Sequence, residues 1–219
     1  MAVLNINTPK YWDGVYAAEG DRQRVDAVRL GALERWVRIC EGEIQRSARV
    51  LDFGCGRGDA LFGLWASRAD RTLVGVDCSP VAIEAAQAER WSLGAHDARF
   101  YVGGSSLVRD VRVGLDATET EPAVLAERFD VIWCGETLEH LDDPWALIDR
   151  FGMVLECGGF LVLSTPFKGR NRSPEHVHEF SPENIVGWAN RLGELVFLDC
   201  CLLPGWLTMF AVIRRGRST

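Results

Sequence analysis

A short apolar segment that runs into a cluster of glycines, RVLDFGCGRGD at 49–59, constrains the fold of this chain more than any other segment. The apolar residues at 50, 51 and 53 predict a buried strand over 49–53, and a helix is predicted over 59–68. Gly54, Gly56 and Gly58 separate the two. A glycine-rich turn between a strand and a helix lets a ligand approach the backbone closely, so the segment predicts a binding site.

The alternation of strands and helices continues to the C-terminal end of the sequence. Further strands are predicted at 72–77, near 98–102, at 129–134 and at 159–165, and helices are predicted to start at Ser79-Pro80, Asp143-Pro144 and Ser181-Pro182. Two last apolar runs, 194–202 and 206–213, have no helix between them and predict an antiparallel hairpin. The fold class is therefore predicted to be α/β, with a doubly wound, mostly parallel seven-stranded sheet that ends in this hairpin.

A length of 219 residues fits one domain with a single substantial core. We expect one domain over 1–219, with an N-terminal helical cap at about 8–45 and a core at about 49–219. Apolar residues at spacings of mostly three and four predict a helix over 22–40 in the cap. The polar, acidic stretch at about 104–127 is interpreted as an insertion with one short helix near 122–127.

Composition excludes several classes of protein. The net charge of −7 argues against a nucleic-acid partner, because proteins that neutralise phosphates usually carry a basic face. No apolar run approaches the ~20 residues that span a bilayer, and the first residues do not resemble a secretory signal. The seven cysteines form no CxxC pair. We therefore expect a cytoplasmic protein with reduced thiols, and the sequence does not predict its oligomeric state.

Two aspartates distinguish this site from a dinucleotide site. The dinucleotide fingerprint GxGxxG would place its third glycine at position 59, but Asp59 stands there, where its charge would repel a pyrophosphate at the helix N-terminus. The same charge is harmless or helpful beside a cationic sulfonium. Asp77 ends the second predicted strand, where its carboxylate can accept hydrogen bonds from both hydroxyls of a ribose.

Four segments in order then resemble the class I S-adenosylmethionine-dependent methyltransferases, and the resemblance covers nearly the whole chain. The matching segments are VLDFGCGRGD (50–59), GVDCSP (75–80), FDVIWCGETLEHLDDP (129–144) and LECGGFLVLSTP (155–166). The resemblance implies S-adenosylmethionine as cofactor and a site that includes Asp52, Gly54, Gly56, Asp77, Cys78, Ser105, Cys134 and Gly135. Asp52 would steer the methionine end of the cofactor, and Asp77 would hold the ribose. Where many relatives bind adenine through an acidic residue, this chain has Gly103-Gly104-Ser105.

The acceptor side is predicted from a second group of residues. Glu136, Glu139 and His140 would share one face if their segment is helical, because they are spaced i, i+3 and i+4. With His178, or with His176 as the alternative, they would suit a divalent metal such as Mg²⁺, Mn²⁺ or Zn²⁺. His140 could instead act as a general base without a metal, or these residues could be purely structural.

Two methyltransferase subfamilies resemble this sequence in the region of these residues. Small-molecule O-methyltransferases of the ubiquinone pathway share the ExLEH segment and a later histidine before an FSPE-like helix start. Small-RNA 3′-terminal 2′-O-methyltransferases, which are metal-dependent, share ExxEH and a downstream HxHxF, matched by His176, His178 and Phe180. The acidic charge favours a small-molecule acceptor with a hydroxyl group. A domain that binds the cofactor without catalysis is the remaining alternative.

Overall fold

The computed structural model describes residues 6–19, 48–67, 71–103, 128–169, 173–203 and 206–216. The predicted helix over 22–40 and the predicted insertion at 104–127, with its short helix and Ser105, lie outside the described residues. The described residues contain no helix that is long and apolar enough to cross a membrane. Cys55, Cys78, Cys134, Cys157 and Cys200 carry thiols rather than disulfides, as the sequence predicts.

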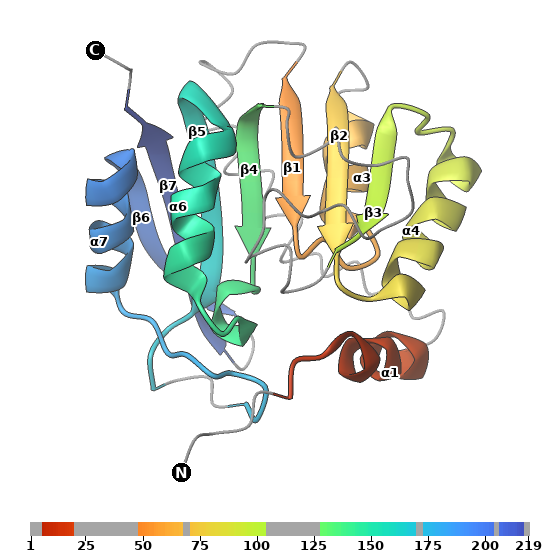
Figure 1. Ribbon diagram of the computed structural model, residues 1–219, viewed down its shortest axis with the longest axis horizontal. Helices are drawn as coiled ribbons and strands as arrows, with labels where there is room; N and C mark the ends of the chain where they lie inside the picture. Colours follow the sequence, from red (N-terminus) through yellow and green to blue (C-terminus); the bar gives the residue numbers. More distant parts are fainter. Residues whose placement is uncertain are drawn as a thin grey trace.

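One seven-stranded sheet organises the molecule, with the strand order β3-β2-β1-β4-β5-β7-β6 (Figure 1). Its strands are β1 (Arg49–Phe53), β2 (Thr72–Asp77), β3 (Ala98–Val102), β4 (Phe129–Gly135), β5 (Leu155–Pro166), β6 (Gly193–Leu203) and β7 (Trp206–Arg215). Strands β1 to β5 pair in parallel, whereas β7 is antiparallel to both β5 and β6. The predicted α/β fold with a C-terminal antiparallel hairpin is confirmed.

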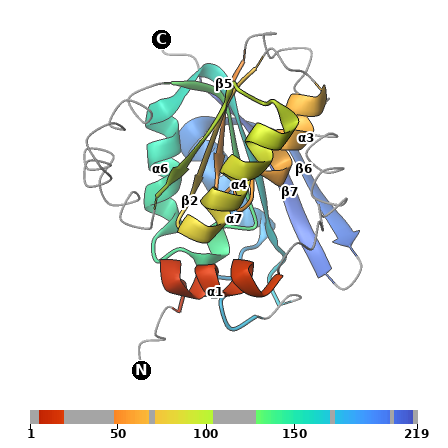
Figure 2. The same cartoon turned by 90° about the vertical axis from the view of Figure 1, so that its right-hand side faces the viewer.

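Helices cover both faces of the sheet, as Figure 2 shows for α3 and α6. The helices are α1 (Pro9–Glu19), α3 (Asp59–Ser67), α4 (Pro80–Leu93), α6 (Pro144–Val154) and α7 (Pro182–Leu192). Alternate residues of each central strand point to opposite faces, so Leu51 packs with α6 and α7 while Val50 packs with α3 and α4. Apolar packing on both faces explains why these strands are nearly continuous apolar runs in the sequence.

Strand β5 starts four residues earlier than predicted. The sequence predicted this strand at 159–165. In the structure α6 ends at Val154 and the chain enters β5 directly at Leu155, which pairs with Phe129. The register shifts between Phe129 and Val131, and Gly158 adopts a φ of +81°. The strand thus includes both Gly158 and Gly159, with an irregular register near its start.

Candidate functional site

The glycine turn after β1 has a backbone conformation that would be strained in a residue with a side chain. Gly54 and Gly56 have φ of +78° and +54°. A Cβ atom on Gly54 would lie 2.2 Å from Thr137 Oγ1, so the turn packs directly against the segment that follows β4. The amides of Gly54 and Cys55 both donate to the Val76 carbonyl. These contacts hold the turn at the carboxyl ends of β1 and β2, where the sequence predicted a ligand.

Asp77 is the carboxylate that this turn surrounds. Its side chain is buried at the end of β2, where Oδ2 accepts a hydrogen bond of 2.8 Å from the Gly56 amide and Oδ1 one of 2.9 Å from the Ser79 amide. Both carboxylate oxygens therefore accept backbone hydrogen bonds, which fix the charge in position at the end of β2.

Cys78 and Ser79 continue from Asp77 into α4. Burial, followed by the negative charge of Asp77, raises the pKa of the Cys78 thiol to about 12, so this side chain is a neutral thiol at physiological pH. Ser79 caps α4 by accepting a hydrogen bond from the Ala82 amide, and its hydroxyl donates to Asp13 Oδ1 in α1. Asp13 could not be recognised from local sequence, because its partner is 66 residues away.

The other predicted cofactor residues occupy different environments. Asp52 is buried within β1, level with Gly75 of β2 and Trp133 of β4. Cys134 is also buried, and its side chain belongs to the apolar core beneath α6 and α7. The backbone of Cys134 can therefore line a ligand site, whereas its thiol faces the core. Gly135 ends β4, where a Cβ atom would lie 2.6 Å from the Trp133 ring.

The segment after β4 does not form the regular helix that would place Glu136, Glu139 and His140 on one face. Helical geometry is limited to the three-residue 3-10 helix η2 (Leu138–His140). Glu136 precedes it with a φ of +49°, which a non-glycine residue seldom adopts. The spacing argument that joined Glu136 to the other two side chains is therefore wrong for this segment.

Glu139 and His140 nevertheless lie together, at the predicted acceptor side. Glu139 is buried, and its Oε2 accepts a hydrogen bond of 3.1 Å from Thr165 Oγ1 at the end of β5. His140 Nε2 lies 3.7 Å from Glu139 Oε1, and His140 Nδ1 lies 3.1 Å from the Glu175 carbonyl oxygen. Because a carbonyl oxygen only accepts, the proton of a neutral His140 ring belongs on Nδ1, which leaves Nε2 as the basic nitrogen.

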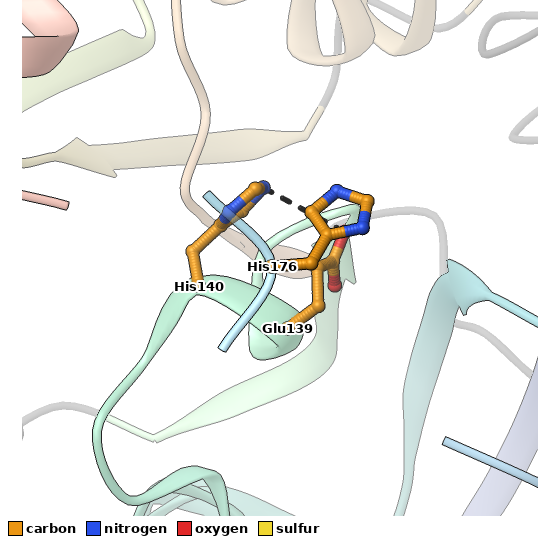
Figure 3. Close-up of side chains that lie close together, drawn as sticks. All are labelled: Glu139, His140 and His176. Atoms are coloured by element: carbon orange, nitrogen blue, oxygen red, sulfur yellow. Dashed lines mark ion pairs between the residues drawn. The ribbon is translucent and has the colours of Figure 1, made fainter. Parts of the chain in front are cut away.

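His176, rather than His178, completes this group (Figure 3). One ligand atom from each of Glu139, His140 and His176 lies within 4.8 Å of the others, which is a spacing that a single metal ion could bridge. His178 instead stacks on Phe180, with its Nε2 3.3 Å from the Asp142 carbonyl oxygen. Neither Glu136 nor His178 belongs to the metal-compatible group among the residues that the structure describes.

Glu175 adds a negative charge beside the two histidines. Burial alone would raise the pKa of its carboxyl, but the hydrogen bond from Ser173, its backbone hydrogen bond and the nearby His176 and His140 together lower the pKa below the ordinary value. Burial first, and then the Glu175 charge, raise the pKa of Tyr11 in α1. The acceptor side therefore contains imidazoles, carboxylates and one neutral phenol.

Comparison with known proteins gives related sequences and a shared fold. A family model described as a methyltransferase domain matches residues 26–194. A ubiquinone biosynthesis O-methyltransferase from Xanthomonas axonopodis pv. citri is 31% identical over 165 residues, covering 75% of this chain and 58% of that protein. The enzyme of the same name from Actinobacillus pleuropneumoniae is 33% identical over 119 residues, covering 53% of this chain and 45% of its own length. The chain thus spans about half the length of these curated relatives.

A solved structure of similar architecture is magnesium protoporphyrin IX methyltransferase from Synechocystis PCC 6803 with bound S-adenosylmethionine. The TM-score is 0.67 at 16% sequence identity, and the match covers 97% of this chain and 93% of that one. Similarity at this level of identity shows a shared fold.

Proposed function

The chain belongs to the class I S-adenosylmethionine-dependent methyltransferases, and on that premise we propose that it transfers a methyl group to a hydroxyl oxygen of a small molecule. The observation that carries the proposal is the position of two chemically different groups at one edge of the sheet. The Asp77 carboxylate lies at the end of β2, and the pair Glu139 and His140 lies just beyond β4. Strand β1 separates these two strands, with the glycine turn at its end.

The residues at the ends of β1 and β2 fit this cofactor. Asp77 is fixed by two amides, and its carboxylate is an acceptor of the kind that the hydroxyls of a ribose require. Asp59 begins α3, where its carboxylate disfavours a phosphate and tolerates a positive charge. When bound, S-adenosylmethionine supplies an electrophilic methyl group on a cationic sulfur. We assign the cofactor side to Asp52, Gly54, Gly56, Asp77, Cys78 and the backbone of Cys134 and Gly135.

On the acceptor side, His140 is suited to remove a proton from the hydroxyl group. For a phenol with a pKa of about 10, ionisation at pH 7 costs roughly 4 kcal/mol, at about 1.36 kcal/mol per pKa unit. A general base within hydrogen-bond reach lowers that free-energy cost by accepting the proton in the transition state. The Glu175 carbonyl fixes the His140 ring through Nδ1, and the Glu139 carboxylate stabilises the imidazolium that forms.

The activity is tested by following release of S-adenosylhomocysteine with a panel of phenols, catechols, aliphatic alcohols and carboxylic acids. A short single-stranded RNA with a free 3′-terminal ribose is included. We expect turnover with a hydroxylated small molecule, strong loss in His140→Gln, and full activity in Asp149→Asn, a control on the exposed Asp149–Arg191 ion pair. Turnover with the RNA and with no small molecule would contradict a small-molecule acceptor and favour the RNA alternative. Cofactor binding without turnover on any acceptor would favour the non-catalytic alternative.

As the alternative to a metal-free base, we propose a divalent cation held by Glu139, His140 and His176, in which His140 Nε2 would be a metal ligand rather than the base. Histidines that bind a metal usually donate their second ring N–H to a carbonyl or carboxylate, and His140 Nδ1 already has the Glu175 carbonyl as its partner. One carboxylate and two imidazoles suit Zn²⁺ or Mn²⁺ better than Mg²⁺, which prefers oxygen ligands. A cation at this position would lower the pKa of the acceptor hydroxyl.

The cation is tested by measuring activity in excess chelator and again after adding back each metal. The matched variants are His176→Gln and His178→Gln, which remove histidines two positions apart. We expect chelation to abolish activity, one metal to restore it, and His176→Gln alone to lower the affinity for that metal. Full activity in chelator, with no metal in the purified protein, would contradict the cation and leave His140 as a metal-free base.

A further inference from the structure

Helix α1 lies across the end of the sheet toward which the parallel strands point (Figures 1 and 2). This is the end that carries both the glycine turn and η2. Side chains of α1 and of the residues just before it reach both parts of the proposed site. We call the contacts near Asp77 the cofactor half and those near His140 the acceptor half.

At the cofactor half, Asp13 joins α1 to the start of α4. Asp13 Oδ1 accepts hydrogen bonds of 2.5 Å from the Ser79 hydroxyl and 3.2 Å from the Val81 amide. The amide of the same Ser79 donates to Asp77 Oδ1. One residue therefore separates the Asp13 carboxylate from the carboxylate proposed to hold the ribose.

Tyr16 makes the second contact at the cofactor half, one helical turn beyond Trp12. A Cβ atom on Gly56 would lie 2.8 Å from the Tyr16 hydroxyl, so this ring lies directly over the glycine turn. The Arg57 guanidinium donates to the Tyr16 carbonyl from the same turn. A ligand that lies across the turn must therefore share its space with Tyr16.

At the acceptor half, Trp12 contacts the proposed base. The indole of Trp12 meets the His140 ring edge to face, with centroids 4.9 Å apart and an interplanar angle of 76°. Asn7, just before α1, donates a hydrogen bond of 2.7 Å to the Glu175 carbonyl, which is also the partner of His140 Nδ1. The orientation of the imidazole thus depends on two residues of this N-terminal segment.

From these contacts we propose that α1 couples the two halves of the site. When a ligand occupies the cofactor half, Asp13 fixes the position of α1. In that position α1 holds the His140 ring through Trp12. Trp12 and Asp13 are adjacent on one helix, so a shift of the helix backbone moves both side chains together. Trp12 is therefore a positioning residue for His140. The proposal rests on the proposed function, because the occupant of the cofactor half is S-adenosylmethionine or its product.

The coupling is tested by NMR of the histidine rings, with S-adenosylhomocysteine as the probe. The chain has four histidines, so their ring signals can be assigned by single substitutions such as His140→Gln. His96, which contacts Trp91 beside the C-terminal end of α4, is the internal reference. Spectra are recorded with and without saturating probe for the parent, Asp13→Ala, Trp12→Leu and the surface control Asp149→Ala, with saturation verified by calorimetry.

We expect the probe to move the His140 signals in the parent and in Asp149→Ala, and to leave those of His96 in place. In Asp13→Ala and Trp12→Leu, the change in the His140 signals on adding saturating probe should be smaller than in the parent by about half or more. Each substitution removes one of the contacts that connect the two halves. An undiminished response in both variants would mean that the probe reaches His140 directly and would overturn the coupling. A parent that binds the probe with no change at His140 would overturn it as well. A parent that does not bind the probe would instead contradict the proposed function.

Discussion

Cys78 follows the proposed ribose-binding carboxylate, and its thiol is held neutral by burial and by the charge of Asp77. A pKa raised from 9.0 to about 12 lowers the thiolate fraction at pH 8 by about a thousandfold. We predict that iodoacetamide at pH 8 modifies the exposed Cys157 far faster than Cys78, as followed by mass spectrometry of tryptic peptides. Modification of both at similar rates would show that the Cys78 thiol is neither shielded nor neutral.

Single residues also show where sequence reasoning succeeds and where it stops. The sequence predicted that Glu139 and His140 act with a downstream histidine, and the structure brings His176 to them. Spacing could not choose between the two histidines, because residues two positions apart in an extended segment would face the same side. In the structure this segment is not regularly extended. The amides of Val177 and His178 both donate to the Glu139 carbonyl, which turns the two imidazoles to different surroundings.

Contacts between residues that are distant in sequence were also beyond prediction. Asp13 and Trp12 were assigned only to a general helical cap, because no local pattern reports that they touch Ser79 and His140. The partners of such side chains are determined by tertiary packing, which the periodicity of the sequence does not reveal.

Among the elements, the turn between β1 and α3 tolerates the least change in geometry. Gly54 has a positive φ, and a Cβ atom there would collide with Thr137, whereas a Cβ atom on Gly94, at a φ of +69°, would meet nothing within 4 Å. Gly94→Ala should therefore cost about 1–2 kcal/mol of folding stability from backbone strain alone. Gly54→Ala should cost more and also weaken cofactor binding.

The two glycine variants are compared by urea unfolding and by calorimetry with S-adenosylhomocysteine. Because both substitutions impose a similar backbone strain, Gly94→Ala serves as the matched control for the collision with Thr137. Equal stability and equal affinity in the two variants would show that the approach of Thr137 to the turn has no consequence.

Element type was predictable wherever a single physical signal was strong. Buried parallel strands such as β1 and β2 are short apolar runs, and α4 starts at a serine cap followed by proline. The start of β5 was predicted four residues too late. The shared face of Glu136, Glu139 and His140, which holds only if their segment is helical, does not apply to the short η2.

For the whole molecule, strand order is what turns separate motifs into one site. Strand β1 lies between β2 and β4, so the parallel arrangement brings the glycine turn, Asp77 and η2 to the same edge of the sheet. The sequence predicted this arrangement through the alternation of strands and helices and through the family resemblance. The neighbours of His140 were not all predictable, since Trp12 and Asn7 belong to a segment that packs across that edge from elsewhere in the chain.

The most direct test of the account is calorimetric titration of the chain with S-adenosylhomocysteine and, separately, with NAD. We predict binding of S-adenosylhomocysteine, no binding of NAD because of Asp59, and a loss in Asp77→Ala of roughly 1.5–3 kcal/mol for each charged hydrogen bond removed. The surface variant Asp149→Ala should bind as the parent does. Binding of NAD without S-adenosylhomocysteine, or an unchanged affinity in Asp77→Ala, would contradict the assignment of this edge of the sheet to the methyl-donating cofactor.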